Sequence, residues 1–367
     1  MNRQNQSPLV TVAIPNYNTA AYIGEAIESA VSQTFHDIEI LIIDNASTDN
    51  SRDIIEDWST RDNRIIVRNF DVYVNATHNW NRCLEYAKGQ YIVFLHADDR
   101  LKPNFLSASL EIFSCRPDLG YVFAEKEIID GEGKVISQDQ FYEASAIIPG
   151  LSEARVNFLG WHTAPVQMLI RTECMRAIGG YEYNDVWPVL LLNLGWDVGY
   201  LHTPLVQYRQ HNQSCTAQFI KDKTMFMTIY LIKMVIMNYH LPPEAAHLIN
   251  LKEKVMERAA YTCLAVYCLD VLGRNEKRLC EEYLALARSF WLDIDQTPLY
   301  QFLNEALMQN NWTVKSLKKA WNIAKPESIS LGPPYPLPDG STPFQSDESY
   351  FHKTSLTKKT SGSGDRP

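Results

Sequence analysis

The chain has 367 residues and carries 34 basic and 43 acidic side chains, a formal net charge of −9. Hydrophobic residues make up 46% of it and charged residues 21%, a composition that excludes a wholly disordered, collagen-like or coiled-coil protein. Because a protein that wraps nucleic acid needs a broad basic surface, the charge argues against a nucleic-acid partner. The length predicts about two domains.

Short apolar runs alternate with helical patterns from Leu9 onward, which predicts βαβ units and a mainly parallel sheet. The apolar residues from Ile23 to Val31 recur at three- and four-residue spacing, as on one face of a helix. A second helix is expected after Asp49, with Ser47 or Asp49 as its N-cap, and a third over residues 77–87. The expected strands are residues 9–14, 38–43, 64–68 and 91–95.

Helical periodicity replaces the strand pattern after about residue 220. Its most apolar run, residues 225–237, is shorter than the roughly 20 residues of a membrane-spanning helix and contains Lys233, so a buried helix is expected. The proline- and serine-rich end cannot bury enough apolar surface to fold, which predicts a disordered tail. The predicted units are an α/β domain over residues 8–220, a helical region over 221–330 and the tail over 331–367.

Signals for secretion and for disulfides are weak in this chain. Residues 1–8 hold no apolar stretch that would serve as a signal peptide. The seven cysteines form no C-x-x-C pair, which argues against a zinc site or redox dithiol and favours reduced thiols. These features predict a cytoplasmic protein.

Polar clusters follow three of the predicted strands. Pro15 to Asn18 follows the first, Asp44-Asn45 the second and His96 to Asp99 the fourth. Because ligands of open α/β sheets bind beyond the carboxyl ends of the strands, one crevice could collect all three clusters. The adjacent carboxylates Asp98 and Asp99 favour a divalent cation bound with a phosphate, although one of them could instead cap a turn while the other is solvated.

The order of several motifs resembles a family 2 glycosyltransferase of the GT-A fold. VTVAIPNYN (10–18) resembles the opening strand and turn of that family, residues 21–51 its helix, second strand and acidic loop, and residues 79–99 the lead into its D-x-D element. Gly179-Gly180-Tyr181 and PLVQYRQH (204–211) resemble the later G-G-F and Y-R-x-H segments. The resemblance implies a GT-A type nucleotide-sugar-binding domain followed by the helical region and the disordered tail.

The resemblance also implies residues that bind the nucleotide sugar. The base and ribose would be held by Pro15, Asn16, Tyr17, Asn18, Asp44 and Asn45. The family usually has a second Asp where Asn45 stands, but an amide carbonyl can still accept a hydrogen bond from N3–H of uracil or thymine. This leaves both UDP and dTDP sugars open as donors.

In the D-x-D element of this chain the three positions are His96, Ala97 and Asp98. The pattern of the family makes Asp98 the ligand of Mn²⁺ or Mg²⁺, while His96 either binds ribose, reaches the metal or simply packs at the strand end. His211 would complete the metal ligands or only close the fold. Arg209 would support the negative charge of the departing diphosphate.

The resemblance places the general base and the acceptor later in the chain. An inverting transferase needs one carboxylate to activate the acceptor hydroxyl, and Asp185 is the nearest match, although it could equally cap a helix over residues 186–194. Trp161 and His162 lie where the acceptor of the family approaches, and an aromatic ring there suits stacking on a sugar; Trp161 could instead cover the sheet as a core residue.

These observations predict a metal-dependent inverting glycosyltransferase that moves a sugar to a saccharide, lipid-linked or other hydroxyl acceptor in polysaccharide or glycoconjugate assembly. Peripheral contact with the inner face of the membrane is left open. A dehydrogenase is disfavoured because no G-x-G-x-x-G turn follows the first strand, and the Gly-rich loop of a sugar-nucleotide pyrophosphorylase is missing too. The altered His96, Asn45 and Asn184 positions leave one alternative, a catalytically inactive nucleotide-sugar-binding regulatory or interaction module.

Overall fold

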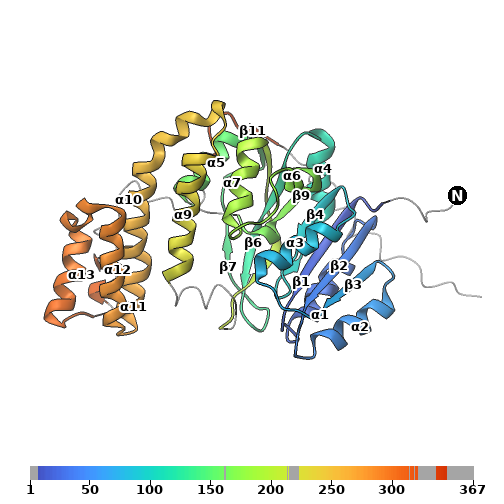
Figure 1. Ribbon diagram of the computed structural model, residues 1–367, viewed down its shortest axis with the longest axis horizontal. Coiled ribbons are helices and arrows are strands. Elements are labelled where there is room, and N and C mark those ends of the chain that lie inside the picture. Colours follow the sequence, from blue (N-terminus) through green and yellow to red (C-terminus); the bar gives the residue numbers. More distant parts are fainter. Residues whose placement is uncertain are drawn as a thin grey trace, which may run out of the picture.

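The computed structural model describes residues 7–160, 163–212, 214, 223–313, 315–317, 319–320 and 336–344. A mixed α/β part with a central sheet is followed by a helical region, as the sequence predicts (Figure 1). The helical region lies beside α5 and α7, at the opposite end of the molecule from β3 and α2 (Figure 1).

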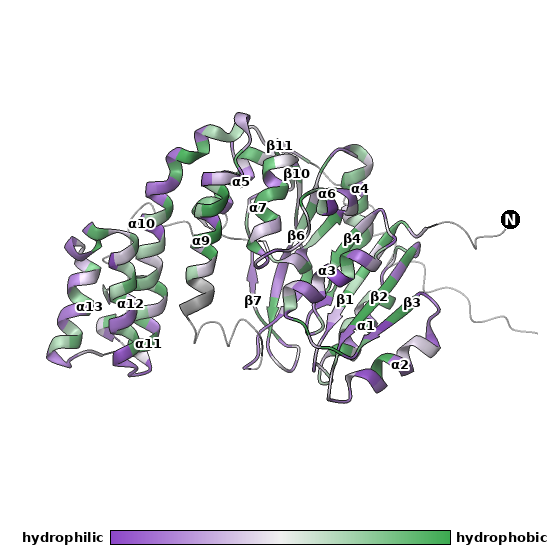
Figure 2. Ribbon diagram, viewed as in Figure 1, coloured by the Kyte–Doolittle hydropathy of each residue, from purple (hydrophilic) through white to green (hydrophobic). Residues whose placement is uncertain are grey.

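The first half of the sheet consists of parallel strands. β1 (Val10–Asn16) pairs with β2 (Ile38–Asn45) and with β4 (Tyr91–Phe94), and β2 pairs with β3 (Ile65–Phe70). All eight residues of β2 are buried, and Figure 2 shows its largely hydrophobic composition. Such a strand is covered on both faces. The four predicted strands are therefore confirmed, and β1 and β2 extend two residues further, into the predicted polar clusters.

The second half of the sheet contains antiparallel strands. β9 (Met168–Arg171) is antiparallel to both β4 and β6 (Tyr121–Ile129), whereas β10 (Val198–Arg209) runs parallel to β6. β5 (Arg100–Leu101) and β7 (Val135–Asp139) pair off the main path, with β10 and β6. The main path reads β11-β8-β10-β6-β9-β4-β1-β2-β3, with β8 at Ala146–Ile148 and β11 at Thr342–Pro343.

Helices of the α/β part cover the sheet. The predicted stripe of α1 (Ile23–Val31) is buried. α2 (Ser51–Arg61) begins at Ser51 with Asn50 as its N-cap, so the expected cap at Ser47 or Asp49 is wrong: Asp49 instead accepts hydrogen bonds from Ser51, at the first residue of the helix. The remaining helices are α3 (Ala76–Tyr86), α4 (Phe105–Cys115), α5 (Gly150–Leu159), η2 (Pro165–Gln167), α6 (Thr172–Ala177) and α7 (Val186–Gly195).

The helical region shares one hydrophobic core with the α/β part. Phe158 of α5 and Trp187 and Leu190 of α7 belong to the same buried cluster as Tyr230 and Ile236 of α9. The helices of the described region do not include one that is long and apolar enough to cross a membrane. The region consists of α9 (Lys223–Tyr239), η3 (Pro243–Leu251), α10 (Lys252–Thr262), η4 (Cys263–Cys268), α11 (Leu269–Gly273), α12 (Lys277–Phe290), η5 (Leu292–Gln296) and α13 (Pro298–Gln309).

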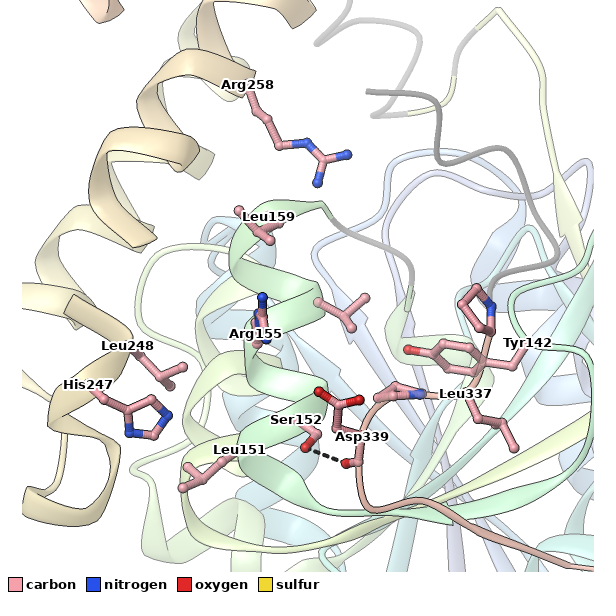
Figure 3. A pocket seen from close by; sticks show the side chains of 13 residues that line it. Tyr142, Leu151, Ser152, Arg155, Leu159, His247, Leu248, Arg258, Leu337 and Asp339 are labelled. Atoms are coloured by element: carbon pink, nitrogen blue, oxygen red, sulfur yellow. Dashed lines mark hydrogen bonds between the residues drawn. The ribbon is translucent and has the colours of Figure 1, made fainter. Parts of the chain in front are cut away.

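Part of the predicted tail has a defined place in the fold. Residues 336–344 return to the sheet, where β11 pairs antiparallel with β8, so the expectation of disorder does not extend to them. They close one side of a cavity of about 540 Å³ beside α5, and Ser152 Oγ donates a hydrogen bond to Asp339 O at 2.8 Å there (Figure 3). Arg155 and Arg258 contribute to the lining, but none of the predicted site residues does.

Candidate active site

Asp44 lies at the centre of the first polar corner. β1 and β2 pair Asn16 with Asp44, and Asn16 Nδ2 donates to Asp44 Oδ1 at 2.8 Å. Arg52 Nε donates to Asp44 Oδ2 at 2.6 Å. Burial alone would raise the pKa of Asp44, but the hydrogen bonds from Ser47, Arg52 and Asn16 outweigh it and hold the pKa below its ordinary value. Asp44 is therefore an ionised acceptor fixed at the carboxyl edge of the sheet.

The turn after β1 is tied to the loop after β2. Asn18, in the left-handed region at φ 52°, accepts a hydrogen bond from Thr48 N at 2.8 Å, and its own N–H donates to Ser47 Oγ at 3.0 Å. The side chain of Tyr17 is exposed, and its ring centroid lies 4.7 Å from that of the equally exposed Tyr73. Two aromatic faces at this rim suit stacking against a flat base. Pro15 lies in β1, one residue before its end, and is half-buried.

Asn45 has a different set of partners from the one expected. Its Oδ1 accepts hydrogen bonds from Val74 N at 2.9 Å and from Arg82 Nη1 at 3.0 Å, and its Nδ2 donates to Val74 O at 2.7 Å. The side chain is buried. The sequence predicts that this carbonyl accepts a hydrogen bond from a pyrimidine N3–H. In the structure the same oxygen anchors the loop between β3 and α3.

The D-x-D element follows β4 and brings acidic and imidazole groups together. Candidate ligand atoms of His96, Asp98 and Asp99 all lie within 4.8 Å of one another. Asp98 Oδ2 lies 3.1 Å from His211 Nε2, so the predicted pair of metal ligands is adjacent. The side chain of Ala97 is buried in the core, which leaves its backbone as the part able to face a nucleotide.

Two buried polar atoms of this cluster lack hydrogen-bond partners among the described residues. They are His96 Nε2 and Asp99 Oδ2, although the latter lies 3.2 Å from His96 Nδ1. Burial lowers the pKa of His96, but the carboxylates of Asp99 and Asp98 outweigh it and raise that pKa. Buried polar atoms are almost always satisfied in proteins, and carboxylate and imidazole groups are suitable ligands for Mn²⁺ or Mg²⁺. The residues present therefore fit a divalent cation.

The guanidinium group of Arg209 binds oxygens of the protein itself, whereas the sequence predicts a contact with phosphate. Its side chain is 1% exposed. Nε donates to Asp98 O at 2.8 Å, Nη1 donates to Gly131 O at 3.1 Å, and Nη2 donates to Glu25. Each guanidinium nitrogen already binds a protein oxygen. This geometry therefore does not provide the predicted support of the departing diphosphate by Arg209.

Asp185 lies at the N-terminus of α7, next to the same cluster. It makes no side-chain capping hydrogen bond; Asn184 Oδ1 accepts the Val186 N–H at 3.0 Å instead. Burial raises the pKa of Asp185 to about 6, and the positive charges of His96 and Lys126 oppose that rise. The carboxylate is thus poised to take up a proton near neutral pH and is not committed to capping α7.

Two residues near the site have no signal in the sequence. The ring of Trp80 on α3 stacks on that of His96 with centroids 5.7 Å apart, and it also contacts Tyr181, 4.7 Å away. Lys126 on β6 contributes positive charge near Asp185 and forms an ion pair of 3.4 Å with Asp139. Local patterning places Trp80 on the helix expected over residues 77–87 and predicts nothing for Lys126.

Backbone conformation and steric contacts explain why two glycines stand in the G-G-Y segment. Gly179 and Gly180 have φ of 83° and 76°, which side chains rarely adopt. A Cβ on Gly180 would lie 2.6 Å from Asn81 Oδ1, the atom that accepts the Tyr181 N–H. The predicted acceptor residues Trp161 and His162 lie outside the described residues.

The fold is a mixed α/β domain with a cluster of polar side chains at the strand ends, and comparisons identify its family. The sequence model of glycosyl transferase family 2 matches residues 11–178, so this domain belongs to that family. An uncharacterized glycosyltransferase of Nostoc, alr2836, is 39% identical over 144 residues, or 39% of this chain and 43% of that protein. Hyaluronan synthase of Pasteurella multocida is 32% identical over 36% of this chain and 14% of its own. The chain thus spans less than half the length of either relative.

Solved structures with the same fold extend over more of the chain. S. aureus TarS 1–349 in complex with UDP-GlcNAc superposes with a TM-score of 0.59 at 17% identity, over 83% of this chain and 92% of that one. Mannosyltransferase PcManGT from Pyrobaculum calidifontis, in complex with GDP-Man and Mn²⁺, gives a TM-score of 0.51 at 15% identity, over 87% of both chains. At these identities the likeness establishes the GT-A type fold alone, and it includes much of the helical region.

Proposed function

We propose that this protein is a metal-dependent inverting glycosyltransferase that transfers a sugar from a UDP or dTDP sugar to an acceptor hydroxyl. The observation that carries the proposal is the cluster of His96, Asp98, Asp99 and His211 at the carboxyl edge of the sheet, with Asp185 in electrostatic range of His96. The family 2 match of the domain supports the enzyme over the inactive module.

Binding of the donor is assigned to the polar corner and the aromatic rim. The carboxylate of Asp44 and the turn around Asn16 and Asn18 would accept hydrogen bonds from the base or ribose, and Tyr17 would stack on the base. Asp98 and His211, with His96 beside them, would hold Mn²⁺ or Mg²⁺. When bound, the cation offsets the negative charge that develops on the diphosphate as it leaves.

Proton removal from the acceptor is assigned to Asp185. Inversion needs a single carboxylate on the side of the sugar opposite the leaving group, and a base with a pKa of about 6 is mostly ionised at pH 7. We expect Asp185→Asn to lower sugar transfer by roughly 10²- to 10⁴-fold, the usual contribution of general-base catalysis, while nucleotide affinity is retained. Unchanged transfer would exclude Asp185 as the base.

The acceptor and the cellular setting complete the proposal. Transfer to a saccharide, lipid-linked or other hydroxyl acceptor, in polysaccharide or glycoconjugate assembly, agrees with relatives such as hyaluronan synthase. We propose a cytoplasmic enzyme, with or without peripheral contact with the inner face of the membrane. Trp161 and His162, which follow α5 in the sequence, remain the proposed acceptor contacts because they lie where the acceptor of the family approaches.

A titration of UDP, dTDP and GDP by calorimetry, each with and without Mn²⁺, tests the proposal. We expect Mn²⁺ to strengthen binding of UDP or dTDP, and Asp98→Ala to abolish this increase. Asp57→Ala is the matched control, because Asp57 is an exposed aspartate on α2 that pairs with Arg61. Binding that is independent of Mn²⁺, or equal in Asp98→Ala and the control, would refute the metal site, and a preference for GDP would refute the donor class.

A further inference from the structure

We propose that Arg209 is a positioning residue for the metal-binding loop and sets its affinity for the cation without touching cation or nucleotide. The proposal rests on the function proposed above. Arg209 is the last residue of β10, and His211 follows two positions later. The same strand end therefore carries both a proposed ligand and the residue that holds the D-x-D loop.

Arg209 binds two successive residues of the loop. Its backbone N–H donates to Asp99 Oδ1 at 2.8 Å, and its Nε donates to Asp98 O at 2.8 Å. The first bond leaves Asp99 Oδ2 as the atom that faces His96, and the second fixes the peptide that carries the Asp98 side chain. Rotation of the Asp99 carboxylate away from the cluster would break the first bond, and rotation of the peptide between Asp98 and Asp99 would break the second.

The guanidinium group is itself anchored on three sides. Nη1 donates to Asp130 O at 3.3 Å and to Gly131 O at 3.1 Å, and Nη2 donates to Glu25. The Tyr22 ring lies 4.7 Å from the guanidinium carbon. A planar fork with several donors can bridge all of these oxygens at once, whereas the single ammonium of lysine cannot.

The anchors connect the metal loop to the start of α1. Glu25 also accepts a hydrogen bond from Arg100 Nε at 2.7 Å, next to the D-x-D loop. The Tyr22 ring lies 4.7 Å from the ring of His211 as well. Tyr22 and Glu25 follow the Tyr17-containing turn directly in the chain, so Arg209 links the proposed nucleotide and metal segments. Residues that orient metal ligands from behind typically change metal affinity by about 10- to 100-fold when altered.

The experiment measures Mn²⁺ binding directly, from the electron paramagnetic resonance signal of free Mn²⁺, in the presence of saturating UDP or dTDP. We expect Arg209→Lys to weaken Mn²⁺ binding at least about 10-fold, while affinity for the same nucleotide without metal changes less than about twofold. Arg278→Lys is the matched control, because the Arg278 side chain is 92% exposed on α12. Mn²⁺ affinity equal to that of the control, or an equal loss of metal-free nucleotide binding, would overturn the proposal.

A second variant covers the case in which Arg209→Lys does not fold. Glu25→Gln keeps the shape of the anchor but removes its charge, and we expect a weaker loss of Mn²⁺ affinity in the same direction. Unchanged Mn²⁺ affinity in folded Glu25→Gln would then overturn the proposal. Failure of the proposed function is distinguishable, because the wild-type protein itself would then show no nucleotide-dependent Mn²⁺ binding.

Discussion

The proton affinity of Asp185 leads to a quantitative prediction about the pH dependence of transfer. With a pKa of about 6, roughly one tenth of the carboxylate is ionised at pH 5 and nine tenths at pH 7. If Asp185 is the base, kcat/KM for the donor should therefore fall about tenfold from its plateau as the pH drops to 5. A bound cation adds positive charge nearby and would move this limb to lower pH.

Lys126 supplies the test of the physical cause. Its positive charge lowers the pKa of Asp185, so Lys126→Met should raise that pKa and move the acid limb to higher pH. Lys134→Met serves as the control, because Lys134 is exposed at the turn between β6 and β7. The plateau rate well above the limb should change little, since Lys126 is not assigned to the reaction itself.

The assay follows release of nucleoside diphosphate from the donor at saturating Mn²⁺ between pH 4.5 and 8, with circular dichroism as a check on folding. Superimposable profiles of Lys126→Met and Lys134→Met would refute the electrostatic argument. A wild-type profile that stays flat from pH 7 down to 4.5 would refute the assignment of Asp185 as the titrating base.

Three further predictions concern stability. Burial raises the pKa of Glu153 from 4.5 to about 7. The stabilising contribution of its protonated form is complete below pH 4.5 and is lost as the pH rises through 7. In urea denaturation, the wild type should lose about 3 kcal/mol of unfolding free energy relative to Glu153→Gln over that range. Gly180→Ala should lower the free energy of unfolding by about 1–3 kcal/mol through strain at positive φ and the clash with Asn81, whereas Gly195→Ala, where nothing lies within 4 Å, should not. Burial lowers the pKa of Lys233 to about 7, so thermal unfolding should show the wild type gaining stability relative to Lys233→Met as the pH rises above 7.

Local sequence was sufficient for the elements that lie deepest in the α/β part. A strand covered on both faces needs an unbroken apolar run, and β2 has one, so its position could be recognised without its neighbours. The clustering of Asp98 with His211 was expected from the resemblance of both segments to family 2 motifs, and the two side chains do lie 3.1 Å apart. The predicted N-cap of α2 was wrong because several residues able to cap stand in a row after β2.

The partners of polar side chains depended on contacts between residues far apart in the chain. Arg209 binds Glu25 and Asp98 O, and Asn45 binds the backbone of Val74, which local patterning cannot show. A buried donor or acceptor takes whichever group the fold brings within reach, because leaving it unpaired costs about 1–3 kcal/mol.

Local sequence therefore predicted β1 to β4, the order of the motifs and the residue types at the ends of these strands, because burial and spacing are local properties. Long-range contacts in the fold were needed to show that Trp80 stacks on His96 and that Arg209 binds the backbone of Asp98. Each of these outcomes is a choice among competing partners, and that choice exists only once the chain has folded.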